Sequence, residues 1–150
     1  MAEVREYVVF KIAKEFYGID IKYVENIEKP QLITRVPYAE EYIKGVINLR
    51  GNVIPVIDVR KRFLLENKKI TNDSRIIVIS YESDRIGLIV DSSSEVVQFE
   101  SDVIEKAPKI GDSVKDDFIK EVGKEENRII MLLDVKKILN INDQENAQVR

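Results

Sequence analysis

The side chains that most often carry out chemistry in proteins are scarce in this sequence. Its 150 residues include no histidine and no cysteine, which removes the imidazole base, the thiolate nucleophile and the usual nitrogen and sulfur metal ligands. Three serines stand together at positions 92–94, but neither a Gly-x-Ser-x-Gly nor a Ser-x-x-Lys pattern occurs. The six glycines are scattered singly, so no Gly-x-Gly loop is present to bind phosphate.

Carboxylates are the remaining candidates for chemistry. Four aspartates each follow an apolar run, namely Asp20, Asp58, Asp91 and Asp134. An aspartate in such a position usually caps a helix or begins a turn, and no Asp-x-Asp-x-Asp loop indicates a divalent cation. Spacing alone leaves open a carboxylate pair for glycoside chemistry. The sequence predicts no catalytic residue, no metal and no cofactor, with capping roles for Asp58 and Asp134.

The charge balance bears on the class of partner. The chain has 24 Lys and Arg against 27 Asp and Glu, a net charge of −3, with the two signs interspersed. Binding to nucleic acid depends on neutralising phosphates and normally needs a basic excess, so that class is disfavoured. No secretory signal is recognised, and the apolar runs are too short to span a membrane. We expect a cytoplasmic protein without direct membrane insertion.

Short apolar runs bounded by turn residues dominate and predict a protein built from β-strands. Gly51 and Asn52 are predicted to form a hairpin turn, in which Gly51 supplies a positive φ, and short helices are predicted after Asp58 and Asp134. The polar residues 141–150 are predicted to form a flexible tail. Strands are expected at residues 7–12, 16–21, 45–50, 53–57, 75–81, 86–90, 95–99, 118–122 and 128–133.

The two halves of the chain resemble each other. A shift of 69 residues places 7–12 on 76–81 and Gly18 on Gly87, and a shift of 76 places 53–61 on 129–137. This period predicts two copies of one small barrel in a single domain, 1–150, with approximate subdomains 5–66 and 75–140. Strand exchange between the subdomains stays open, as does a chance likeness between apolar strands.

Local signals for a binding surface are weak on their own. Val24 and Ile27 stand among polar residues, which is consistent with an exposed apolar contact or with core positions. Arg50 lies at a hairpin mouth, where its planar guanidinium can meet a partner or simply be solvated. The residues themselves do not decide between these interpretations.

Residues 43–63, Ile-Lys-Gly-Val-Ile-Asn-Leu-Arg-Gly-Asn-Val-Ile-Pro-Val-Ile-Asp-Val-Arg-Lys-Arg-Phe, resemble the central motif of the CheW family of chemotaxis adaptors. The resemblance extends over about residues 5 to 140, including 17–21, 87–91 and 132–139. It implies an all-β fold of two packed five-stranded SH3-like barrels with short helical segments. The related module also occurs in the kinase CheA and in CheV, but 150 residues without histidine leave no room for their additional domains, so the free-standing adaptor is expected.

The resemblance also implies a function. Members of the family couple the cytoplasmic tips of chemoreceptors (methyl-accepting chemotaxis proteins) to the regulatory domain of CheA at receptor arrays on the inner face of the membrane. The receptor-binding positions carry over to Val24, Asn26, Gly45 and Arg50. Asn26 departs from the acidic residue common there, which puts a charge contact at that position in doubt. The kinase-binding residues are not assigned. A different SH3-like module that binds peptide or RNA is the alternative, and a small enzyme comes last.

Overall fold

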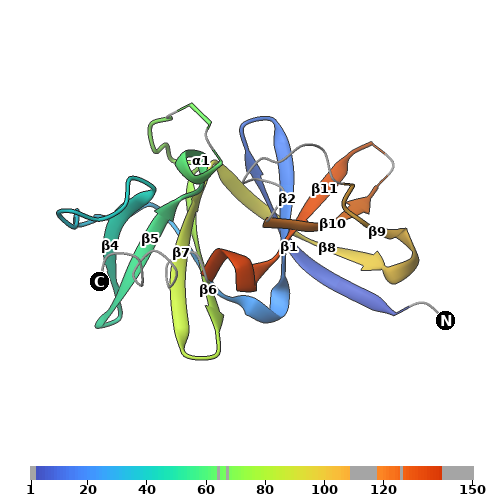
Figure 1. Cartoon of the computed structure of the whole chain (residues 1–150), viewed down its shortest axis with the longest axis horizontal. Helices are drawn as coiled ribbons and strands as arrows, with labels where there is room; N and C mark the ends of the chain where they lie inside the picture. Colours follow the sequence, from blue (N-terminus) through green and yellow to red (C-terminus); the bar gives the residue numbers. More distant parts are fainter. Residues whose placement is uncertain (1–2, 64, 67, 109–117, 126, 140–150) are drawn as a thin grey trace.

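The computed structural model describes residues 3–63, 65–66, 68–108, 118–125 and 127–139. The fold consists of two β-sheets that lie side by side (Figure 1). The six strands of one sheet are, in spatial order, β8 (Ser92–Glu100), β1 (Val4–Ile12), β2 (Glu15–Asp20), β11 (Ile129–Leu133), β10 (Ile119–Lys124) and β9 (Ile104–Lys106). The five strands of the other are β3 (Val24–Glu28), β6 (Arg75–Tyr81), β7 (Asp84–Val90), β5 (Asn52–Asp58) and β4 (Ile43–Leu49).

The two halves of the chain exchange their first hairpins. Hairpin β1–β2 pairs with β8 and β11 of the second half, and hairpin β6–β7 pairs with β3 and β5 of the first half. In each case the outer partner is antiparallel and the inner partner is parallel. The sheets therefore divide the chain differently from the ranges 5–66 and 75–140, through the strand exchange that the sequence left open.

In each sheet, one segment of the chain runs from one edge strand to the other and closes the barrel. Strand β8 continues through the 3-10 turn η2 (Ser101–Val103) into β9, so one bent segment pairs with β1 at one edge and with β10 at the other. In the other sheet, the chain after β3 reaches β4 at Thr34, which exchanges two 2.8 Å backbone hydrogen bonds with Val46. The predicted pair of five-stranded SH3-like barrels is confirmed, with β8 and β9 counted as one bent strand.

One apolar core joins the two barrels. The largest buried cluster includes Ile12 and Ile19 from one sheet and Ile77 and Leu88 from the other. Its aromatic centre also crosses the junction, since the ring centroid of Phe63 lies 5.5 Å from Tyr17 and 5.9 Å from Phe118. A barrel of this size alone is near the lower limit for a stable core, and the shared cluster provides the missing burial.

Two short helices occupy equivalent places in the repeat. Asp58 is the N-cap of α1 (Val59–Arg62), and its carboxylate accepts from backbone N–H groups at 3.1 and 3.4 Å. Asp134 accepts from the N–H groups of Lys136 and Lys137 at the same two distances, at the start of the helix over residues 135–139. The internal repeat is therefore present in local geometry as well as in sequence, and both aspartates have the capping role predicted for them.

One detail differs from the sequence-based expectations. The β4–β5 loop consists of Arg50 and Gly51, because Leu49 pairs with Asn52, so the turn lies one residue earlier than predicted. The serines at 92–94 begin β8, which pairs with β1 as far as Ser92. The predicted flexible tail, 141–150, lies outside the described residues.

Candidate functional site

The β4–β5 turn presents Arg50 to solvent in an unusual backbone conformation. Arg50 has φ of 52° and Gly51 has φ of 85°, so both central residues of this two-residue loop are left-handed. That geometry matches the right-handed twist of the flanking strands, and Asn48 supports it by accepting the Gly51 N–H at 2.9 Å. Glycine adopts this conformation freely, whereas arginine in the left-handed region costs about 1–2 kcal/mol. A strained and exposed arginine is a candidate for function.

Strand β3 lies next to this turn and contributes Asn26. With the Asn26 amide oriented to satisfy both of its polar atoms, its oxygen accepts from Arg50 Nη1 at 3.3 Å. The register of β3 against β6 shifts between Val24 and Asn26, which is a bulge at Glu25. Bulges re-aim neighbouring side chains, and here Glu25 points outward to an ion pair with Arg85. The structure therefore brings Asn26 and Arg50 together from two edges of the barrel.

Gly45 and Val24 have different surroundings from these two polar residues. Gly45 is buried with φ of 153°, and a Cβ there would lie 2.2 Å from the Thr34 carbonyl oxygen. Because Gly45 has no side chain, the segment around Thr34 can lie close against β4 and pair with it. Val24 is half-buried and packs against the main core, whereas Ile27 on the same strand is 44% exposed. Of the two apolar positions on β3, Ile27 is the one that offers surface to a partner.

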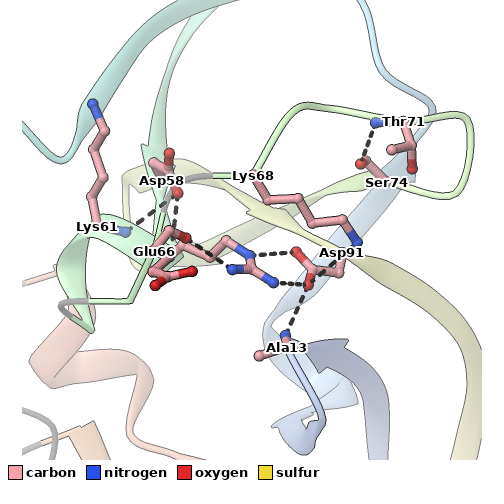
Figure 2. Close-up of polar contacts among 9 residues, drawn as sticks. Ala13, Asp58, Lys61, Glu66, Lys68, Thr71, Ser74 and Asp91 are labelled. Atoms are coloured by element: carbon pink, nitrogen blue, oxygen red, sulfur yellow. Dashed lines mark hydrogen bonds and ion pairs between the residues drawn. The ribbon is translucent and has the colours of Figure 1, made fainter.

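The sequence-based reasoning missed the main polar cluster, which lies where α1, the β1–β2 turn and the end of β7 meet. Asp91 forms a bidentate ion pair with Arg60, with Nε–Oδ1 at 3.0 Å and Nη2–Oδ2 at 2.6 Å. It also accepts the backbone N–H of Ala13 at 2.8 Å and lies 3.8 Å from Lys68 Nζ (Figure 2). Arg60 and Asp91 stand 31 residues apart in the chain, and no local pattern in the sequence marks them as partners.

The electrostatics of the Asp91 cluster follow from partial burial. Desolvation raises the pKa of Asp91, but the hydrogen bonds from Arg60 and from the Ala13 amide outweigh it and leave the pKa below its usual value. The Asp91 and Arg60 side chains are only 13% and 15% exposed, so water screens the pair weakly. Because Ala13 belongs to one barrel and Arg60 to the other, the cluster ties the barrels together.

Two searches of the described residues bear on other kinds of site. Within the part of the chain that the structure describes, no group of three or more acidic side chains is placed to hold a metal ion. The helices described there are also too short to cross a membrane.

The fold and this site define a double SH3-like barrel with an arginine-bearing turn at its surface, which is the architecture of a protein-interaction module. The chain belongs to the CheW family, since the model of the CheW-like domain matches residues 6–143. The chain is 42% identical over 141 residues to the chemotaxis protein CheW of Bacillus subtilis (strain 168), covering 94% of this chain and 88% of that protein.

Further relatives agree with this assignment. The chemotaxis protein CheW of Helicobacter pylori (strain ATCC 700392 / 26695) is 34% identical over 137 residues, covering 91% of this chain and 82% of that protein. The crystal structure of the scaffolding protein TtCheW from Thermoanaerobacter tengcongensis superposes with a TM-score of 0.81 at 36% identity, covering 89% of this chain and 90% of that one.

Proposed function

We propose that this chain is a non-enzymatic chemotaxis adaptor that couples chemoreceptors to the histidine kinase CheA. The observation that carries the proposal is the β4–β5 turn, which holds Arg50 exposed in a left-handed conformation within the family motif. The family supports a scaffold role, and the proposed partners place the adaptor in the cytoplasm, at receptor arrays on the inner face of the membrane.

The proposed receptor-facing residues have different roles. Arg50 and Asn26 form the polar contact, with the guanidinium held by the Asn26 oxygen at 3.3 Å. Gly45 acts indirectly, because it lets the segment around Thr34 pack on β4. Val24 supports the apolar part of β3 from within. Arginine is enriched at energetic hot spots because its planar fork makes several directed hydrogen bonds.

The kinase-facing surface is proposed to be an exposed barrel edge or end. Strand β4 is a candidate, because among the described residues its outer edge is paired only at the bridge between Thr34 and Val46. The corresponding strand of the other barrel, β10, is paired with β9 at Glu121, Val122 and Gly123. Partly unpaired edges accept a strand from a partner, which suits pairing with a similar barrel.

Such an adaptor works by coupling free energies. A receptor change can bias the kinase only by the difference in the adaptor's contacts with the two receptor states. No group with a reactive pKa is needed for this.

The test is co-sedimentation of the full chain with a receptor tip fragment and the CheA regulatory domain. We expect a ternary assembly that Arg50→Ala weakens by about tenfold, in the range of a hot-spot residue. Lys14→Ala, in the exposed turn of the β1–β2 hairpin, is the matched control and should assemble as the wild type does. Failure of the wild-type chain to bind either partner would refute the adaptor function, and unchanged assembly by Arg50→Ala would refute the site.

A further inference from the structure

Both barrels carry a β-bulge at the same place in the internal repeat. Glu25 is the extra residue of β3 against β6, and Ser94 is the extra residue of β8 against β1. The shift of 69 residues places the first of these on the second. A bulge re-aims the side chains beside it, so this irregularity gives both copies of the barrel the same local geometry.

In each barrel the residue after the bulge contacts an arginine from a hairpin turn. Asn26 accepts from Arg50 of the β4–β5 turn at 3.3 Å, and Glu95 forms a 2.6 Å ion pair with Arg128 of the β10–β11 turn. Arg128 also pairs with Glu125, and its side chain is only 22% exposed. Arg50 is exposed, and its contact with Asn26 is to a neutral amide. The same device therefore neutralises one arginine and holds the other with its charge available to a partner.

An ion pair fixes the bulge in the barrel that carries Arg50. Arg85, near the start of β7, reaches across β6 to β3 and donates to both carboxylate oxygens of Glu25, with Nε–Oε2 at 2.9 Å. The two side chains are 29% and 35% exposed. A bidentate pair of this kind fixes the direction of both side chains better than a single contact does. The pair therefore holds Glu25 away from Arg50 and keeps the bulge in one conformation.

The bulge in turn orients the amide of Asn26. The amide nitrogen donates to the backbone carbonyl oxygen of Glu25 at 3.0 Å, which leaves the amide oxygen facing Arg50. A chain of contacts thus runs from Arg85 through Glu25 and Asn26 to the guanidinium of Arg50.

We propose that Arg85 is a positioning residue for receptor binding and acts on Arg50 through the bulge at Glu25. The guanidinium that the Asn26 amide holds in place loses less conformational freedom when the receptor tip binds, and this raises the affinity. The inference rests on the adaptor function and adds Arg85 and Glu25 to the residues on which receptor binding depends.

The first test measures the affinity of full-chain variants for a receptor tip fragment. Arg85→Gln and Glu25→Gln each break the ion pair and should weaken binding about threefold to fivefold. The double variant should bind no more weakly than either single variant, because the two side chains act as one unit. Lys124→Gln is the matched control, since it removes one positive charge and breaks a cross-strand ion pair with Glu105 in the other barrel, and it should bind as the wild type does.

Two further measurements separate positioning from a direct contact. In an Arg50→Ala chain, Arg85→Gln should change the affinity no further, because its effect passes through Arg50. In the free protein, the NMR signals of the Asn26 side-chain amide should shift in Arg85→Gln and stay in place in Lys124→Gln.

The outcomes distinguish this inference from the proposed function. If Arg85→Gln binds like the wild type while Arg50→Ala binds more weakly, the positioning role fails and the adaptor function stands. Equal weakening by Arg85→Gln and Lys124→Gln overturns the inference, because it indicates attraction by net charge alone. Further weakening in the Arg50→Ala chain, or unchanged amide signals of Asn26, also overturns it. If the wild-type chain does not bind the tip, the adaptor function fails and the positioning role fails with it.

Discussion

Replacement of Arg50 by asparagine should stabilise the protein and weaken its assembly at the same time. Arg50 is held at φ of 52° by the two-residue β4–β5 turn. Asparagine is one of the few residues besides glycine that adopt the left-handed region readily, whereas a long side chain there is strained. Asparagine also avoids the extra freedom that glycine gives to the unfolded chain.

The magnitude follows from two opposing contributions. Relief of the left-handed strain gains about 1 kcal/mol in the free energy of unfolding. The Arg50 to Asn26 hydrogen bond at 3.3 Å is lost, but Arg50 is exposed, and such a bond contributes less than about 0.5 kcal/mol net. The net gain of roughly 0.5–1 kcal/mol corresponds to a melting temperature about 1–4 °C higher for a chain of this length.

The assay is urea denaturation together with co-sedimentation of the receptor tip and kinase domain. Glu82→Asn is the matched control, because Glu82 is exposed at φ of 56° in the β6–β7 turn and lies outside the proposed receptor-facing residues. Both variants should be stabilised, and only Arg50→Asn should assemble poorly. Stabilisation of Glu82→Asn alone would refute the strain argument at Arg50, and intact assembly by Arg50→Asn would refute its role as an anchor.

Gly45→Ala should lower the free energy of unfolding by about 3 kcal/mol, because the new Cβ displaces Thr34 and its two hydrogen bonds from β4. Gly51 has open space around it, so Gly51→Ala should lower the free energy of unfolding by only about 1 kcal/mol, through φ strain. Urea denaturation measures both, and equal losses would contradict the packing argument. Asp91→Asn should cost about 3 kcal/mol near neutral pH, because it leaves the Arg60 guanidinium unpaired and weakly solvated. Since the folded pKa of Asp91 lies below its unfolded value of about 3.9, this stabilisation is complete above that value and is lost as the pH falls through the folded pKa. A difference between wild type and Asp91→Asn that stays constant under acid would contradict the assignment.

The internal repeat shows what could be predicted locally. The caps at Asp58 and Asp134 depend on residues at most three positions away, and a carboxylate followed by free N–H groups makes the same bonds wherever it occurs. The positive φ of Gly51 is a similarly local requirement of a tight hairpin. The turn was nevertheless placed one residue late, because the exact loop depends on which residues pair across the strands.

The exchange of hairpins could not be predicted from the same patterns. Strand periodicity states which face of a strand is buried but not which strand lies beside it. A barrel made within each half and a barrel made by exchange bury the same apolar residues, so both satisfy the pattern. Only the three-dimensional structure shows that Gly18 lies against Leu132 and Gly87 against Val56, each from the opposite half of the chain.

The sequence by itself determined the β-rich class, the repeat, the caps and the exposed turn, because these depend on periodicity and on near neighbours. The tertiary structure decided which side chains meet: Asn26 with Arg50, Asp91 with Arg60 and Ala13. It also decided that Gly45 is buried beneath Thr34 and does not face a partner directly. Such contacts join residues far apart in the chain, and their geometry exists only once the exchanged hairpins have closed the two barrels.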